Sequence, residues 1–231
     1  AYEICACLGG SEMCIRDSPI EGRNLKGVHF ALELLSQQNR ILEGIVIPSK
    51  DIINCKGKKV LVIGGGDTGS DCVGTANRHK AASVTQIEIM PQPPVGHNPA
   101  TPWPLYPQVL KTSSSHEEGC IRRWNLASVR FIGDKNTLKG VEVEEIEWQP
   151  TEKEGRPEMR KTGRTEVIEA DLVFLAMGFI HPEQEGLVKE LSLAVDARGN
   201  IAVDPVTNQI ADTNLFASGD AVSGALSLIH I

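Results

Sequence analysis

A buried strand that leads directly into a glycine-rich turn is the feature that most constrains the fold of this chain. Residues 59–63 are four apolar residues after a lysine, a pattern typical of a parallel strand buried on both faces. The turn Gly-Gly-Gly-Asp-Thr-Gly follows at 64–69, and then come a helix-compatible stretch and a second predicted strand at 84–90. Strand, turn, helix and strand within about 30 residues predict a βαβ unit.

The three spaced glycines of this turn match the Gly-x-Gly-x-x-Gly pattern of dinucleotide-binding folds. The pattern alone is weak, but here it lies after a buried strand and at the start of a helix, as binding requires. Gly64 allows the tight turn, Gly66 lets the backbone approach a pyrophosphate, and Gly69 lets helix and strand pack closely. The helix N-terminus offers N–H groups to the phosphates. We predict a dinucleotide site here, with a purely structural turn as the alternative.

Three polar side chains lie close to this predicted site. A carboxylate at Asp67 suits the helix dipole but would repel a diphosphate, so we expect it to cap or orient the loop, while Thr68 contacts phosphate. Glu88 ends the second strand, where the fold places the acid that accepts hydrogen bonds from the adenosine ribose. No Arg or Lys follows Glu88 before Lys111, which favours NADH over NADPH. The alternative is an exposed glutamate without a ligand.

The segments on either side of this unit are of different kinds. Residues 28–35 have the apolar spacing of an amphipathic helix. Residues 91–107 are rich in proline, which excludes a regular helix or a central strand and predicts an extended surface loop. A helix start follows, with Ser114 or Ser115 as its cap. We expect His116 to serve capping and surface hydrogen bonding rather than to act as an acid.

From residue 129 the apolar period changes to two, which indicates strands. The alternation continues to about 148, with a turn predicted at 134–136. Residues 150–166 are charged and contain glycine and proline, so we expect an exposed loop there. Strand character returns at 167–168 and 172–175. These segments predict an antiparallel β-meander that closes back into the parallel sheet.

Two glycines towards the end of the chain carry further predictions. The hydrophobic strand at 172–175 leads to Gly178, where the chain can turn closely beneath a nucleotide, although an ordinary strand end explains it as well. Leu-Phe-Ala-Ser-Gly-Asp at 215–220 places Asp220 at the end of a predicted strand, after Gly219, which permits close approach of a ligand. The Asp220 carboxylate can accept a hydrogen bond from a polyol such as the ribityl chain of a flavin, or it can be a turn residue without a ligand.

Composition excludes several classes of protein. The net charge of -7 argues against nucleic acid as a partner. No stretch approaches the roughly 20 apolar residues of a membrane span. Six cysteines without Cys-x-x-Cys spacing argue against a disulfide scaffold, a zinc site or a redox pair. We therefore expect reduced thiols, no metal site and a cytoplasmic location.

Together these residues resemble the flavoproteins with two dinucleotide-binding domains, in which an NAD(P)H domain is inserted into an FAD domain. Within them the chain is similar to the small (beta) subunit of glutamate synthase. The similarity is specific, because the proline-rich loop and the Ser-Ser-Ser-His-Glu-Glu segment are not general features of Rossmann folds. The similar stretches are 64–73, 91–94, 112–120 and 170–179.

The resemblance implies cofactors and a partner. In this family NAD(P)H gives a hydride to FAD, and electrons pass through iron–sulphur clusters to FMN on a large subunit, where 2-oxoglutarate and glutamine-derived ammonia become glutamate. By resemblance, the Gly64 to Gly69 turn would bind NADH or NADPH, and Asp220 would contact the FAD ribityl chain. Hydride transfer between stacked rings needs positioning, so we expect no acid–base residue. The first FAD fingerprint and the cluster ligands are expected upstream of this chain.

We thus predict an α/β fold, with a Rossmann-like parallel-sheet NAD(P)H domain and an antiparallel β-meander inserted into a partial FAD-binding domain. Residues 1–17 resist interpretation, 18–48 belong to the FAD domain and a linker, 49–177 form the NAD(P)H domain, and 178–231 continue the FAD domain. The alternatives are a paralogous electron-input module for another partner and a nucleotide-binding module without redox turnover. The Gly219–Asp220 pair favours the redox interpretation.

Overall fold

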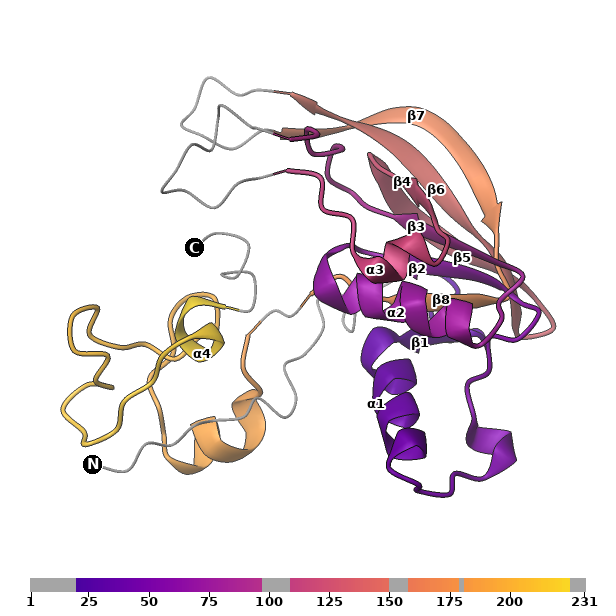
Figure 1. Cartoon of the computed structure of the whole chain (residues 1–231). Coiled ribbons are helices and arrows are strands. Elements are labelled where there is room, and N and C mark those ends of the chain that lie inside the picture. The colour runs from indigo at the N-terminus through magenta and orange to yellow at the C-terminus, as the bar shows by residue number, and fades with distance from the viewer. Residues whose placement is uncertain (1–19, 97–108, 150–157, 179–180, 225–231) are drawn as a thin grey trace. The chain divides into compact units, whose positions relative to one another are not determined.

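The structure is a computed structural model, and it describes residues 20–96, 109–149, 158–178 and 181–224 (Figure 1). The chain divides into two compact units. The first, the sheet unit, comprises the described residues of Pro19–Val95 and Leu110–Met177. The second, the C-terminal unit, includes the described residues from Gly178 onwards.

A five-stranded sheet with parallel neighbours forms the centre of the sheet unit. Its two central strands are almost wholly buried, as expected for strands covered on both faces. In spatial order the strands are β1 (Val28–Phe30), β8 (Leu172–Leu175), β2 (Lys59–Ile63), β3 (Ser83–Ile87) and β4 (Ile121–Arg123). The predicted βαβ unit is confirmed, because β2 pairs parallel with β3 on either side of the glycine turn and its helix.

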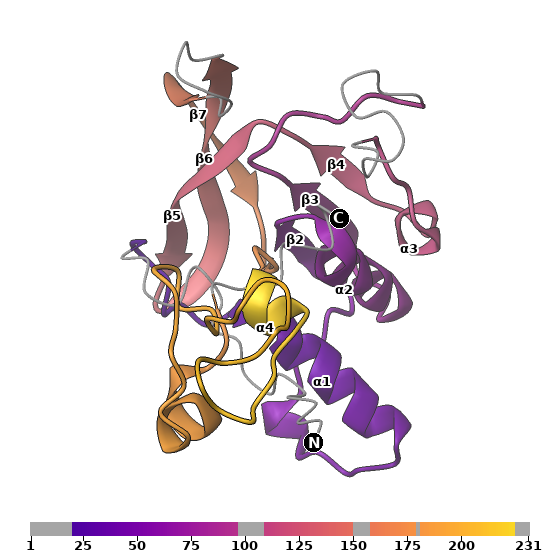
Figure 2. The same cartoon turned by 90° about the vertical axis from the view of Figure 1, so that its left-hand side faces the viewer.

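Helices and a second sheet cover the two faces of this sheet (Figures 1 and 2). On one face lie α1 (Ala31–Leu42), α2 (Gly66–Arg78) and the short α3 (Ser114–Glu117), with α2 in contact with both others. On the other face lies the predicted antiparallel meander. Its strands are β5 (Leu126–Asp134), β6 (Thr137–Gln149) and β7 (Glu158–Glu169). Lys135 and Asn136 form the predicted tight turn, both with positive φ.

Strand β7 corrects the loop predicted over 150–166. Residues 158–166 pair with β6, and 150–157 lie outside the described residues. The strand is at the edge of its sheet and exposes most of its side chains, so it has no apolar alternation to reveal it. Opposite charges across the pair stabilise it instead, through Lys161 with Glu144 and Arg164 with Glu145.

The helix predicted over 28–35 was wrong at its start. Val28 to Phe30 form β1, which pairs with β8, and the helix begins at Ala31. A three-residue strand is too short to show a period of two, and its partner lies far along the chain. Through this pairing, residues 20–48, which we expected in the FAD domain, lie in the sheet unit together with the glycine turn. The connection to β2 includes one helical turn, η1 (Ser49–Asp51).

The C-terminal unit has little regular structure among its described residues. It contains an interrupted helical segment, η2 (Gln184–Val188), and α4 (Asp220–Ser223). The strand expected before Asp220 is only an isolated bridge between Gln209 and Phe216. Buried apolar residues form a small core of this unit: Val188, Ile201, Ile210 and Ala221. No helix in the described part of the chain is long and apolar enough to cross a membrane.

Candidate functional site

The first glycine of the turn occupies a space that no other residue would fit. Gly64 has φ +108°, and a Cβ added to it would lie 2.3 Å from the carbonyl oxygen of Ala176, just after β8. Its N–H donates to the carbonyl oxygen of Ile87 at 2.9 Å. The turn is therefore held between the ends of β8 and β3, at the carboxyl edge of the parallel sheet, where open α/β sheets bind ligands.

The other two glycines differ from each other in their surroundings. Gly66 has φ +69°, and no atom lies within 4 Å of a Cβ built on it, so the backbone is open to a ligand there. A Cβ on Gly69 would lie 2.6 Å from the carbonyl oxygen of Gly64. Gly69 thus has the close strand–helix packing expected of the third glycine, and Gly66 has the open approach expected of the second.

The start of α2 is available to an anion. Its N-cap is Gly65, which has no capping side chain, so the first N–H groups of this 13-residue helix have no side-chain acceptor in the described part of the chain. Asp67 is exposed and does not cap the helix, which was one of the two roles expected of it beside orienting the loop. Thr68 is half-buried in the first turn, next to the open approach at Gly66.

Glu88 lies one residue beyond β3 and turns its carboxylate towards the glycine turn. A Cβ on Gly65 would lie 2.4 Å from Glu88 Oε2, and the Glu88 side chain is only 21% exposed. The carboxylate therefore lies at the glycine turn and is mostly buried, rather than exposed at the end of the strand.

An arginine beside Glu88 removes one of the two grounds for the predicted preference for NADH, the lack of a nearby basic residue, and leaves the other, the Glu88 carboxylate, in place. Strand β4 pairs with β3 and brings Arg122 Nη2 to 3.5 Å from Glu88 Oε1. Arg122 also donates to the carbonyl oxygen of Lys111 at 2.9 Å and packs over the ring of Trp124. No basic residue follows Glu88 directly in the sequence, but the neighbouring strand places Arg122 beside it in the fold. Only the strand order reveals this, and no local pattern in the sequence predicted it.

A chain of hydrogen bonds behind the turn was also missed. Ser113 caps α3, where we had expected Ser114 or Ser115, and its hydroxyl bonds to Ser70 of α2. His116 serves the cap, as expected, because its Nδ1 accepts from the N–H of Ser113 at 3.2 Å. Its Nε2 lies 2.9 Å from Gln86 Oε1, so it also reaches the parallel sheet. Burial, and secondly the charge of Arg122, lower the pKa of His116.

The remaining predicted residues lie in the C-terminal unit. Gly178 and Gly219 both have positive φ, at +85° and +67°. Gly219 is the N-cap of α4, and Asp220 is the first residue of that helix. The structure does not relate these three residues to the glycine turn.

The described cysteines have the properties of unreactive thiols. Burial raises the pKa of Cys55 to about 11 and that of Cys72 to about 12, and Cys120 is raised to about 11 for the same reason. A thiol with so high a pKa supplies almost no thiolate at neutral pH. These residues fit the expected reduced state and are poor candidates for redox chemistry.

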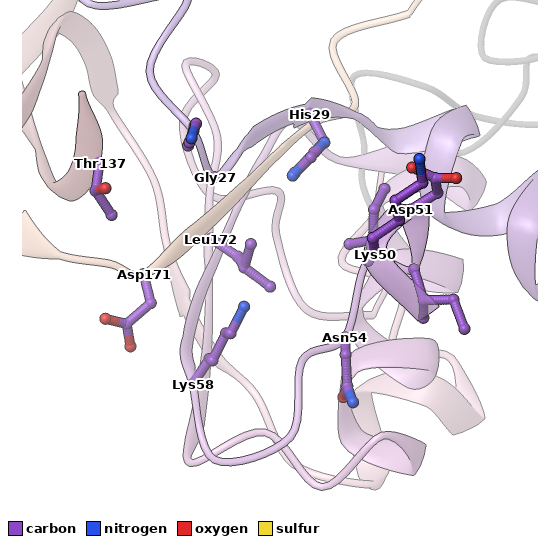
Figure 3. Close-up of a pocket in the computed structure, with 12 residues that line it drawn as sticks. Gly27, His29, Lys50, Asp51, Asn54, Lys58, Thr137, Asp171 and Leu172 are labelled. Atoms are coloured by element: carbon purple, nitrogen blue, oxygen red, sulfur yellow. The ribbon is translucent and has the colours of Figure 1, made fainter. Parts of the chain in front are cut away.

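One cavity of the sheet unit lies at the opposite edge of the parallel sheet (Figure 3). Gly27, Lys58 and Asp171 in its wall come immediately before β1, β2 and β8. The cavity therefore faces the amino ends of the parallel strands. Dinucleotides bind at the carboxyl ends in such folds, so we do not assign the coenzyme to this cavity.

Comparison with known proteins gives one family match and several relatives. Residues 108–231 match the family model described as pyridine nucleotide-disulphide oxidoreductase. The glutamate synthase [NADPH] small chain of Mycobacterium tuberculosis is 42% identical over 198 residues, 84% of this chain and 40% of that protein. The Bacillus subtilis small chain is 35% identical, over 96% of this chain and 45% of its own length. The glutamate synthase [NADH] of Schizosaccharomyces pombe is 36% identical, over 96% of this chain and 11% of its own length.

This chain thus spans less than half the length of those curated relatives. Solved structures share its fold at low identity. Thioredoxin reductase of T. acidophilum matches with a TM-score of 0.58 and 21% identity, over 95% of this chain and 57% of that one. Mycobacterium tuberculosis FprA in complex with NADPH matches with a TM-score of 0.59 and 15% identity, over 93% of this chain and 56% of that one.

Proposed function

Because the chain belongs to the pyridine nucleotide-disulphide oxidoreductase family, we propose that it is the NAD(P)H-binding part of a flavoprotein that supplies electrons for glutamate synthesis. The observation that carries this proposal is the glycine turn. It combines an open backbone at Gly66, an uncapped start of α2 and the carboxylate of Glu88 at one edge of the sheet. Phosphate oxygens suit the first two of these features and ribose hydroxyls suit the third.

The protein's part in the reaction is to bind and orient. NAD(P)H supplies the hydride and FAD accepts it, and such a transfer depends on how the two rings are held. The N–H groups at the start of α2 and Thr68 hold the pyrophosphate, and Glu88 holds the ribose. Gly178, Gly219 and Asp220 are assigned to the flavin, with the Asp220 carboxylate accepting from a ribityl hydroxyl. We assign no catalytic acid, base or thiol, consistent with the raised pKa values of Cys55 and Cys72.

The proposed role in glutamate synthesis rests on the names of the similar proteins. The curated bacterial proteins that match over most of this chain are named as glutamate synthase small chains. We propose that the electrons reach a large subunit or domain that makes glutamate from glutamine and 2-oxoglutarate, with iron–sulphur clusters carried outside this chain. The cytoplasmic location stays a prediction.

We propose that NADH is the preferred coenzyme. Glu88 holds the place of the ribose acid, and a 2′-phosphate would have to displace its carboxylate from Arg122. The names of the relatives include both coenzymes, so the choice has to be measured on this chain.

Titration of the purified chain with NADH and with NADPH tests the site. We expect micromolar binding of NADH and weaker binding of NADPH, and Glu88→Gln should reduce the difference by about tenfold, the value of one charged hydrogen bond. Glu117→Gln, at an exposed glutamate of α3, is the matched control and should bind as the unaltered chain does. A folded chain that binds neither coenzyme would refute the proposal. Binding of NADH without any FAD-dependent reduction of an artificial acceptor would favour the alternative of a nucleotide-binding module without redox turnover.

A further inference from the structure

A continuous set of hydrogen bonds connects α2 and α3 to the first glycine of the turn. The hydroxyl of Ser70 meets that of Ser113, and Ser113 Oγ lies 2.9 Å from His116 Nδ1. His116 Nε2 lies 2.9 Å from Gln86 Oε1, and Gln86 Nε2 donates to the carbonyl oxygen of Gly64 at 3.0 Å. We call these five residues the relay. None of its side chains was predicted to act at the site.

The relay determines which ring nitrogen of His116 carries the proton. The carbonyl oxygen of Gly64 can only accept, so the Gln86 amide nitrogen faces it and Gln86 Oε1 must itself accept. His116 therefore carries its proton on Nε2, and its Nδ1 accepts from the N–H and the hydroxyl of Ser113. Ser70 then donates to the oxygen of Ser113. Nδ1 can accept both of these bonds from Ser113 only if His116 is neutral.

The relay helps to fix the backbone of Gly64, the first residue of the glycine turn. Strand β3 holds Gly64 from both sides, since Ile87 accepts from its N–H at 2.9 Å and Gln86 donates to its carbonyl oxygen. Gln86 is 1% exposed, so its amide has no water to replace a lost partner. A Cβ on Gly69 would lie 2.8 Å from Gln86 Nε2. The third glycine of the motif thus also makes room for this amide.

We infer that Gln86 and His116 are positioning residues of the dinucleotide site, which hold the Gly64 peptide so that the N–H groups of the turn face the phosphates. This inference rests on the proposed function of the turn. Neither side chain is placed against the coenzyme, and both act through the backbone. Without the relay the Gly64 carbonyl loses a buried donor, and the turn is free to rotate away from the geometry that phosphate binding needs.

Protonation of His116 removes one bond of the relay. A proton on Nδ1 would face the N–H of Ser113 at 3.2 Å, and two donors cannot bond to each other. The hydroxyl of Ser113 can instead accept from the protonated Nδ1, and Nε2 still donates to Gln86. Among the described residues, the charged group that acts on His116 is Arg122 on β4, which is itself paired with Glu88. Burial and Arg122 keep the pKa of His116 below its usual value, so the relay is intact at neutral pH. Coenzyme binding should weaken slightly as the pH falls through this lowered pKa, because only the bond from the Ser113 N–H is lost.

Three variants of the 231-residue chain test the inference with NADH as the probe. Gln86→Leu and His116→Phe remove a donor and should weaken binding by about tenfold at a pH of about 8. His116→Gln keeps an amide donor towards Gln86 but cannot titrate, so it should bind almost as the unaltered chain does. It should also lose the extra weakening that the unaltered chain shows at a pH of about 5.5. His79→Gln is the control, since His79 also has a pKa lowered by burial but bonds to Gln38 instead.

Nitrogen NMR of the histidines gives a readout that does not depend on the coenzyme. His116 should show the Nε2–H tautomer at neutral pH, and the opposite tautomer would overturn the relay. If the unaltered chain binds NADH and a folded His116→Phe binds equally well, the inference fails while the proposed function stands. If the unaltered chain binds neither coenzyme, both fail. If Gln86→Leu does not fold, the decision rests on His116→Phe and on the tautomer of His116. Unchanged NADH binding by the first, or an Nδ1–H tautomer, would overturn the inference.

Discussion

At the scale of single residues, two glycines offer a controlled comparison. Gly66 and Gly57 have φ of +69° and +68°, and neither has an atom within 4 Å of an added Cβ. They lie on opposite sides of β2, and only Gly66 is in the glycine turn. Alanine at either position would lower the stability by the same amount, about 1–2 kcal/mol, because its side chain disfavours the left-handed backbone conformation.

We predict that Gly66→Ala weakens NADH binding by about tenfold beyond any effect of Gly57→Ala, because its methyl group fills the space where the pyrophosphate approaches. Isothermal titration of both variants measures the difference, and their melting temperatures should agree. Equal binding by the two variants would show that Gly66 has no part in coenzyme binding.

Gly64→Ala should lower the stability of the fold more than the affinity for NADH. The added methyl carbon would lie 2.3 Å from the carbonyl oxygen of Ala176, in a rigid part of the backbone. We expect a loss of about 3 kcal/mol in the free energy of unfolding, from overpacking and the positive φ together. Urea denaturation measures this loss. An alanine variant as stable as the unaltered chain would mean that the end of β8 can move away.

At the scale of elements, ion pairs connect the two sheets, and the pair of Arg123 on β4 with Glu166 on β7 can be tested on its own. The two terminal nitrogens of Arg123, Nη1 and Nη2, face the carboxylate of Glu166, one of them at 3.1 Å. Arg123 lowers the pKa of Glu166, so the pair stabilises the fold above the carboxyl's unfolded pKa and loses this effect as the pH falls through the lowered one. The pair is partly exposed, so its contribution is small.

We predict a coupling energy of about 0.5–1 kcal/mol between Arg123 and Glu166 at neutral pH, from a double-mutant cycle with Arg123→Gln and Glu166→Gln. The coupling should vanish at a pH well below the ordinary pKa of a glutamate. A coupling that persists in acid would show that packing, rather than charge, joins β4 to β7.

The elements that sequence reasoning found are those with local patterns. β2, the glycine turn and α2 follow one another with a clear change of period, and the hairpin of β5 and β6 turns at two residues with positive φ. What it missed depends on distant partners. β1 has three residues and is defined by β8, and β7 is stabilised by charges on β6.

The candidate site divides in the same way. The glycines and Glu88 were found because their spacing follows from the turn itself. Arg122 and His116 were not, since only the order of the strands and the docking of α3 bring them near Glu88 and Gln86. Spacing in the sequence predicts which side chains of one continuous βαβ unit lie together. It does not predict side chains that belong to another strand or helix, such as Arg122 and His116.

At the scale of the whole molecule, the boundary of the coenzyme unit can be tested by truncation. Sequence reasoning placed it at 49–177, whereas β1 and α1 complete the sheet unit from residue 20. A fragment of 49–177 would expose the pairing edge of β8 and remove Leu34, which is fully buried.

We predict that a fragment of 20–177 unfolds cooperatively and that one of 49–177 is less stable by several kcal/mol, since the burial of Leu34 alone is worth about 2 kcal/mol. Circular dichroism during urea denaturation compares the two. Equal midpoints would show that β1 and α1 add nothing to the stability of the unit.

The order of the strands also determines when this site can exist during synthesis on the ribosome. β8 lies between β1 and β2, although it is the last strand of the unit to be translated. The N–H of Lys59 bonds to a side chain 112 residues later, and Gly64 packs on the carbonyl oxygen of Ala176. A nascent chain therefore emerges with its glycine turn complete in sequence but unsupported, and the proposed coenzyme site can form only when β8 leaves the exit tunnel and inserts between strands already made.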